Sequence, residues 1–242
     1  MHRFYLAKKI NGDTIVISDA EQLHHLRGVL RLKMNDEVAV FDDAGNEFTC
    51  RITGLSKSQA ALRVHSKKTM QSNKVKLTIA CAIPKMGKMD DIVDSLTQLG
   101  VDAIIPMQTE RVVVSLDGGK REAKLERWRK IARSAAEQSQ RNSIPRIEPV
   151  TSLETVISQS QDYDLKLIPA LFDERKPIKE VLTKSKAGNI LVLVGPEGDF
   201  TPEEIELAKG AGFIPVSMGD SVLRVATAAI AVASFIRLSL FS

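Results

Sequence analysis

Three short turns in the last third of the sequence carry the residues best suited to bind a ligand. Each turn directly follows an apolar run of the kind that forms a buried strand. The turns are residues 170–172, 195–198 and 219–224, and the runs are residues 165–171, 190–194 and 214–218. In an open parallel sheet, ligands bind beyond the carboxyl ends of the strands, because loops and helix N-termini converge there. Glycines in the second and third turns let the backbone come close to such a ligand.

The chemistry of these turns favours an adenosyl group over a phosphate. The sequence contains neither a G-x-x-x-x-G-K-S/T loop nor a G-x-G-x-x-G fingerprint, which disfavours a nucleotide-dependent Rossmann enzyme. The turns also offer few positive charges to neutralise a phosphate. A Gly-Pro-Glu-Gly turn at residues 195–198 also suits a tight connection between a strand and a helix, and that alternative stays open.

The elements that must position the turns alternate between strand and helix from residue 75 onward. Thr201 followed by Pro202 and Glu204 has the spacing of a capping box at the start of a helix. The alternation predicts an α/β domain with an open, mainly parallel sheet. The predicted strands are residues 75–83, 103–107, 112–114, 165–171, 190–194 and 214–218, and the predicted helices are residues 88–99, 121–140, 201–210 and 225–240.

The first 70 residues predict a separate, β-rich unit. Short alternating runs are separated by turn signals, and one stretch, residues 20–30, has helical spacing instead. A polar, aperiodic stretch at residues 67–74 marks the boundary, so we expect domains at residues 1–70 and 74–242. The predicted strands of the first domain are residues 14–17, 37–41, 47–52 and 59–64.

Composition indicates a water-soluble globular chain with two basic regions. Of the 242 residues, 43% are hydrophobic and 26% charged, and no apolar run is long enough to span a bilayer. Residues 1–72 hold 11 basic and 8 acidic side chains, and residues 118–148 hold nine basic and four acidic ones. Two basic regions suit a polyanion such as RNA, although from charge alone ordinary solvated charge is the favoured explanation. Cys50 and Cys81 have no paired spacing, so we expect no disulfide and no metal site, and a cytoplasmic location.

Several motifs, taken in order, resemble the SPOUT (trefoil-knot) methyltransferases. The sequence Val-Gly-Pro-Glu-Gly at residues 194–198, Leu223-Arg224 and Thr227-Ala228 resemble the cofactor loops of that class. The most similar family is the RsmE type, which methylates N3 of a uridine in small-subunit ribosomal RNA. The resemblance extends over nearly the whole chain, through residues 3–5, 25–31, 110–113, 127–132 and 135–139.

The resemblance implies a fold, a cofactor and an assembly. The fold would be an α/β trefoil-knot domain with a small N-terminal PUA-like β-barrel that binds RNA. The cofactor would be S-adenosylmethionine, and the enzyme would be a homodimer acting on small-subunit ribosomal RNA or the assembled subunit. The resemblance places the cofactor against Leu171, Gly195, Pro196, Glu197, Gly198, Met218, Gly219, Val222, Leu223, Thr227 and Ala228.

Arginines are the candidate catalytic residues. Removal of the proton from uridine N3 leaves an anion that a guanidinium can stabilise, and we expect Arg111 or Arg224 to do so. Structural pairing of Arg224 and phosphate binding by Arg111 are equally compatible with the sequence. For RNA contact we expect six residues: Arg3, His25, Arg27, Arg31, Lys33 and Arg141.

Three positions depart from the usual family pattern, and they leave other functions open. Asp199 stands where the family has a second glycine, Ala226 where it has Glu before Thr-Ala, and Gln98 where it has Glu. The change at Ala226 keeps open a weakly active or non-catalytic RNA-binding protein, and a SPOUT enzyme for another nucleotide is a further alternative. A ribose 2′-O-methyltransferase is disfavoured, because no Asn-x-Gly motif lies near residues 165–171.

Overall fold

The computed structural model describes residues 1–69, 75–84, 88–111, 118–171 and 174–240. The chain divides into two compact units: Met1–Ser72 with Ala136–Ile144, and Asn73–Ala135 with Pro145–Ser242. The strand expected at residues 112–114 and the expected turn residue Phe172 lie outside the described residues. Each unit has its own sheet.

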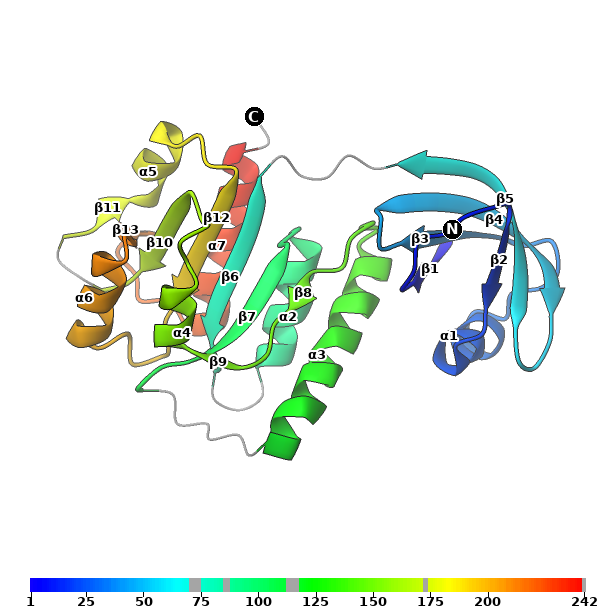
Figure 1. Ribbon diagram of the computed structural model, residues 1–242, viewed down its shortest axis with the longest axis horizontal. Helices are drawn as coiled ribbons and strands as arrows, with labels where there is room; N and C mark the ends of the chain where they lie inside the picture. Colours follow the sequence, from blue (N-terminus) through cyan, green and yellow to red (C-terminus); the bar gives the residue numbers. More distant parts are fainter. Residues whose placement is uncertain (70–74, 85–87, 112–117, 172–173, 241–242) are drawn as a thin grey trace. The chain divides into compact units, whose positions relative to one another are not determined.

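The N-terminal unit is built on a five-stranded sheet with the strand order β1-β3-β4-β5-β2 (Figure 1). β1 and β3 are parallel and the other neighbours are antiparallel, with register shifts in the β4–β5 pair near Cys50 and Gly54. β4 buries every second side chain along residues 46–52, which places Phe48 and Ile52 in the core. The strands are β1 (His2–Leu6), β2 (Thr14–Ile17), β3 (Glu37–Asp42), β4 (Asn46–Leu55) and β5 (Ala60–Thr69).

The stretch expected to form one helix at residues 20–30 changes its winding midway. It begins as α1 (Ala20–His24), with the Asp19 side chain accepting from the Gln22 amide as an N-cap. It continues as a π-helical turn, η1 (His25–Val29). Leu23 and Leu26 are buried, whereas Val29, which shares their spacing, is 58% exposed, so the apolar spacing identified only part of the buried face and did not identify the wider turn. Such π-helical turns occur often at functional sites.

The C-terminal unit has an eight-stranded sheet in which every registered pair is parallel. The main path runs β11-β13-β10-β12-β6-β7-β8, and β9 also pairs with β7. This confirms the α/β class and the mainly parallel sheet. The strands are β6 (Lys76–Ala82), β7 (Ala103–Gln108), β8 (Arg146–Ile147), β9 (Thr151–Ser152), β10 (Leu165–Pro169), β11 (Lys176–Pro177), β12 (Asn189–Val194) and β13 (Ile214–Ser217).

Helices pack against this sheet and bury its central strands (Figure 1). α7 contacts β6, β12 and α2, whereas α4 contacts β7 and α6. On β12, Leu191 and Leu193 share a core with α4 and α6, and the alternate residues Ile190 and Val192 are also buried. A strand covered on both faces is therefore apolar throughout, as the sequence showed. The helices are α2 (Met89–Gln98), α3 (Gly118–Gln138), α4 (Leu153–Ser158), α5 (Ile178–Lys184), α6 (Pro202–Gly210) and α7 (Val225–Leu240).

α7 is the most apolar helix, but it runs for only 16 residues. In the described part of the chain, no helix combines the length and hydropathy that crossing a membrane requires. Near its end, the Arg237 guanidinium is buried, with its side chain 6% exposed. It pairs with Asp102 at 2.5 Å and donates to the carbonyls of Val75 and Gly100. These bonds tie the end of α7 to residues beside β6 and β7.

Candidate functional site

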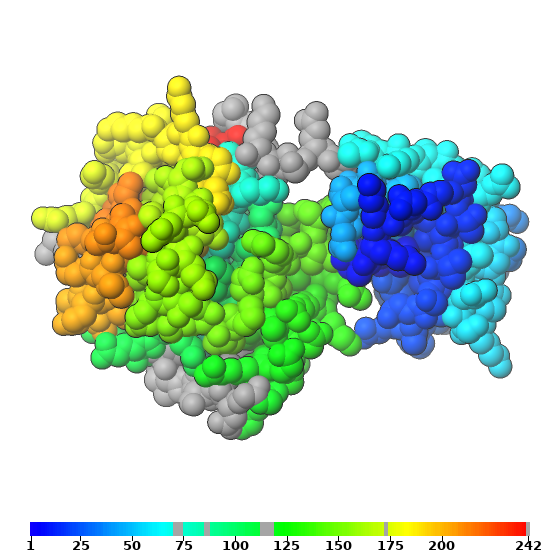
Figure 2. Space-filling view, viewed as in Figure 1, coloured from blue at the N-terminus to red at the C-terminus, as the bar shows by residue number. Residues whose placement is uncertain are grey.

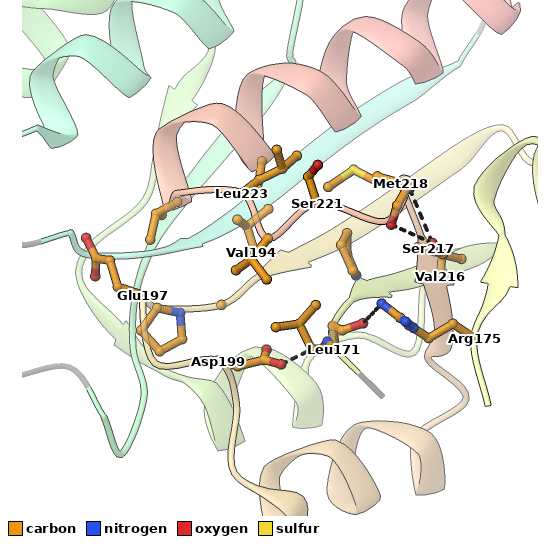
Figure 3. A pocket seen from close by; sticks show the side chains of 18 residues that line it. Leu171, Arg175, Val194, Glu197, Asp199, Val216, Ser217, Met218, Ser221 and Leu223 are labelled. Atoms are coloured by element: carbon orange, nitrogen blue, oxygen red, sulfur yellow. Dashed lines mark hydrogen bonds between the residues drawn. The ribbon is translucent and has the colours of Figure 1, made fainter. Parts of the chain in front are cut away.

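The turns after β10, β12 and β13 meet around one pocket at the carboxyl edge of the sheet (Figure 3). The three strands are neighbours and parallel, so their carboxyl ends lie side by side. The pocket holds about 620 Å³ of empty space, a volume that includes its open mouth. Its lining residues are Pro169, Ala170, Leu171, Arg175, Val194, Gly195, Pro196, Glu197, Asp199, Val216, Ser217, Met218, Gly219, Ser221, Val222, Leu223, Val225 and Ala228.

Two glycines in the lining are needed for specific physical reasons. A Cβ at Gly195 would lie 2.8 Å from the ring of Phe200, and that ring is buried in the core. Gly195 therefore lets the β12 turn lie directly on Phe200. Gly219 has φ +122°, a backbone conformation that other residues rarely adopt. Both turns thus depend on glycine for their shape at the pocket.

The pocket suits a cationic nucleoside better than a phosphate. Its walls include the apolar side chains of Val194, Met218 and Leu223. Of the described residues that line it, Arg175 is the one cation, whereas Glu197 and Asp199 are carboxylates. An anionic phosphate would be repelled by that excess of negative charge, whereas a sulfonium group would be attracted.

Nine of the eleven residues expected at the cofactor line this pocket, and Gly198 and Thr227 do not. Gly198 follows Glu197 in the β12 turn, with its carbonyl turned to Arg111, and Thr227 is exposed on the first turn of α7. The structure adds lining residues that sequence reasoning missed. Arg175 comes from the segment leading into β11, and Ser217 and Ser221 flank Gly219. Ser221 lies in the turn at residues 219–224 that the sequence singled out, whereas no motif marks Arg175 or Ser217.

Arg111 is held beside the β12 turn. Its guanidinium donates to the Gly198 carbonyl, and the preceding amide, that of Glu110, donates to the Glu204 carboxylate at 2.9 Å. Arg224 immediately precedes α7; its side chain is exposed and its carbonyl accepts from the Ala228 amide at 2.8 Å. Arg111 thus contacts the β12 turn through its side chain, and Arg224 ends the turn after β13 in the chain, but neither side chain is part of the lining.

Of the residues expected to contact RNA, some have exposed side chains and others already bond to groups within the protein. His25, Arg27, Arg31 and Lys33 are exposed on and after η1. The Arg3 side chain is only 9% exposed; it pairs with Glu47 and donates to Asn142 and to the Arg141 carbonyl. Arg141 is half-buried and donates to Ser143 at 3.0 Å. Arg3 thus has a structural position inside the N-terminal unit.

The three departures from the family pattern lie in different surroundings. Asp199 lines the pocket and has φ +59°, which explains why a glycine is common there and why aspartate is tolerated. Ala226 is half-buried in the first turn of α7 and does not line the pocket. Gln98 donates to Asp94 on the exposed side of α2. Only Asp199 therefore bears directly on the pocket.

The two cysteines are buried thiols. Burial raises the pKa of Cys50 to about 12, and burial together with the negative charge of Glu197 raises that of Cys81 to about 12. Both are therefore protonated at neutral pH, when neither is a nucleophile. In the described parts of the chain, no cluster of three or more His, Cys, Asp or Glu side chains is arranged to hold a metal ion.

Comparisons with known proteins agree with this geometry. The RNA methyltransferase domain family matches residues 71–237, and the RNA methyltransferase PUA domain family matches residues 17–64. A relative from Bacillus subtilis named ribosomal RNA small subunit methyltransferase E is 33% identical over 216 residues, covering 86% of this chain and 84% of its own. One from Rickettsia conorii with the same name is 29% identical over 239 residues, covering 98% and 95%.

Solved structures agree with the sequence relatives. The ribosomal RNA small subunit methyltransferase E of Neisseria gonorrhoeae, bound to S-adenosyl methionine, has a TM-score of 0.89 and 30% identity, covering 98% of this chain and 97% of its own. This likeness confirms the trefoil-knot fold class with an N-terminal PUA domain. The chain belongs to the RNA methyltransferase family, in the group named ribosomal RNA small subunit methyltransferase E.

Proposed function

We propose that this protein transfers the methyl group of S-adenosylmethionine to N3 of a uridine in small-subunit ribosomal RNA. The observation that supports this most is the pocket at the ends of β10, β12 and β13, with its glycine turns, apolar walls and excess of carboxylates. Relatives that share the fold over 98% of this chain include one bound to S-adenosyl methionine and named for ribosomal RNA. When bound, the cofactor supplies an electrophilic methyl group on a positively charged sulfur.

The chain's own residues position the two reactants. Uridine N3 carries a proton, so its lone pair becomes available only when that proton leaves. A guanidinium beside the base stabilises the resulting anion, and Arg111 is our first candidate because its side chain is held against the β12 turn. Arg224, at the start of α7, is the second. Close positioning of the two reactants lowers the barrier further.

RNA binding is assigned to both units. In the domain at residues 1–70 we propose contacts from His25, Arg27, Arg31 and Lys33, whose side chains are exposed. Arg141, which lies within the expected second domain at residues 74–242, belongs instead to the N-terminal unit in the structure and is the further contact that we propose there. Arg3 is buried and paired, so this surface rests on the other five residues.

In the methyltransferase domain at residues 74–242, the exposed face of α3 (green in Figures 1 and 2) supplies the positive charge. Residues 118–135 carry seven basic and two acidic side chains, a net charge of +5, whereas the whole chain carries +4. The remainder of the chain is therefore at −1. Contacts between this helix and RNA phosphates would weaken steeply with salt.

We further propose that the enzyme is a cytoplasmic homodimer. The dimer rests on the resemblance to the SPOUT methyltransferases, and Leu238 on α7, which is 73% exposed, is one apolar residue available to a second subunit. Sedimentation of the purified protein across a concentration series tests this assembly. A monomer at all concentrations would refute it.

Single-turnover methylation of small-subunit RNA tests the catalytic assignment. Arg111→Lys keeps the charge but loses the planar, two-pronged donor, so we expect the single-turnover rate to fall about 100-fold with S-adenosylmethionine affinity unchanged. Arg146→Lys is a matched control on an exposed arginine that lies outside the proposed RNA-binding residues. Full activity of Arg111→Lys would refute the role of Arg111.

A second candidate function is a non-catalytic RNA-binding protein, favoured by Ala226 in place of an acidic residue. Calorimetry with S-adenosylmethionine separates the two. An enzyme binds the cofactor, whereas a pure binding protein shows no heat.

A further inference from the structure

A single peptide group in the pocket wall is held at both of its polar ends. The Leu171 amide donates to Oδ2 of Asp199 at 2.8 Å, and the Ala170 carbonyl accepts from the Arg175 guanidinium at 3.5 Å (Figure 3). The amide and the carbonyl belong to the same peptide bond, Ala170–Leu171. The peptide therefore lies between an anion on its N–H side and a cation on its C=O side. All four residues that hold or carry it line the pocket.

Asp199 is itself fixed in the orientation that this contact needs. Its backbone amide donates to the Pro196 carbonyl at 3.0 Å, which closes a turn, and its φ is +59°. Its second oxygen, Oδ1, accepts from the Phe200 amide at 2.9 Å. With one oxygen used inside its own turn, the other is directed across to the turn after β10. Asp199 thus joins two of the three turns that form the pocket.

The contact decides what Leu171 can offer a ligand. The amide is bonded to Asp199 and the preceding carbonyl to Arg175, so both polar groups of the peptide already have a partner in the pocket wall. The Leu171 side chain, by contrast, is part of the lining in a residue that is 53% exposed. An exposed leucine at a pocket wall presents an apolar surface to whatever binds there.

We infer that Asp199 and Arg175 are positioning residues that fix the Leu171 side chain against the nucleoside part of the cofactor. This inference rests on the proposed function for the identity of the ligand. Asp199 contributes more than Arg175, because both bonds involve a charged side chain and that of Asp199 is 0.7 Å shorter, at 2.8 Å against 3.5 Å. Neither residue takes part in proton transfer or methyl transfer.

Two substitutions at position 199 separate the carboxylate from the backbone conformation. Asp199→Gly keeps the favoured positive φ and removes both acceptors, whereas Asp199→Asn keeps the positive φ and one acceptor oxygen. We expect S-adenosylmethionine to bind about tenfold more weakly to Asp199→Gly and within about threefold of normal to Asp199→Asn. kcat at saturating cofactor and KM for RNA stay unchanged. Glu203→Gln, an exposed carboxylate nearby, controls for charge.

Substitution of Arg175 provides a second test of the inference. Because both side chains act on one peptide, the effect of Arg175→Met should be much smaller in the Asp199→Gly background than in the normal protein. Additive effects would overturn the inference. So would normal cofactor affinity in Asp199→Gly, or equal losses in the glycine and asparagine variants.

Hydrogen exchange of the Leu171 amide tests the contact without any ligand. We expect exchange in the ligand-free protein to be faster in Asp199→Gly than in Glu203→Gln. Should the normal protein bind no S-adenosylmethionine, the proposed function fails, but this measurement still decides whether Asp199 holds the turn. Unchanged exchange at Leu171 would overturn the inference by itself.

Discussion

Glu204 links the start of α6 to the segment that carries Arg111, and its removal gives the sharpest test of how the site is held. Oε2 of Glu204 accepts from the Thr201 amide at 2.8 Å and completes a capping box. Oε1 accepts from the Glu110 amide at 2.9 Å. The Glu204 side chain is buried, so its replacement by alanine leaves both amides without this partner.

The expected loss in the free energy of unfolding follows from these two hydrogen bonds. A hydrogen bond to a charged group contributes about 1.5–3 kcal/mol, and we take the lower figure for each of the two amides, because Glu110 lies at an exposed turn and Thr201 at the N-terminal end of a helix. We expect Glu204→Ala to lower the free energy of unfolding by about 3 kcal/mol. Glu204→Gln retains one acceptor oxygen and should cost about half as much.

Urea unfolding followed by Trp128 fluorescence measures this change. Trp128 is the single tryptophan and is buried in the C-terminal unit, so it reports on that unit. Glu206→Ala, an exposed carboxylate on the same helix, should stay within about 0.5 kcal/mol of normal. Because the Glu110 amide precedes Arg111, Glu204→Ala should also slow methylation. If Glu204→Ala unfolds like Glu206→Ala, the contact does not stabilise the unit and the reasoning is wrong.

Three further predictions concern buried polar groups. Burial alone would raise the pKa of Asp42, but hydrogen bonds from the Ile10 amide and from Asn46 lower it below its ordinary value of 3.8. The Asp42 carboxylate therefore stabilises the fold fully above about pH 4, and this contribution is lost as the pH falls through its lowered pKa in the folded protein. The free energy of unfolding of Asp42→Asn should therefore depend less on pH in acid. Arg237→Met should cost about 3–5 kcal/mol in thermal unfolding, and a loss under 1 kcal/mol would contradict the buried pair. Cys50 and Cys81, with pKa values raised to about 12, should react with a thiol reagent at pH 7.5 only after denaturation, and stability should fall as pH rises above about 9.

The sequence predicted the sheet and the pocket turns well, because both follow from local pattern. Continuous apolar runs at residues 190–194 and 214–218 identified the buried strands β12 and β13, and the capping box at Thr201 marked the start of α6. Parallel pairing then required the turns after these strands to share one edge. The cofactor and the family came from resemblance, since no single motif specifies a sulfonium ligand.

Other features depend on long-range contacts that no local pattern contains. Strand β1 was not predicted, and it is held by parallel pairing with β3. Arg3 looks like a surface cation in the sequence, yet its partner Glu47 and the carbonyl of Arg141 remove it from solvent. The Asp199–Leu171 bond spans 28 residues and likewise follows from the tertiary fold.

The segment Ala136–Ile144 has a consequence for modular exchange between relatives. It belongs to the N-terminal unit although it follows most of α3 in the chain. Within that unit, the Tyr5 amide donates to Glu137 and Arg3 donates to Asn142. A gene fragment that ends at residue 70 would omit both partners, so the Arg3 guanidinium would lose its hydrogen bond to Asn142. Recombination that transfers the PUA domain intact must therefore carry two separate pieces of coding sequence. A chimera that receives only the first piece would lack the native partners of Arg3 and Tyr5.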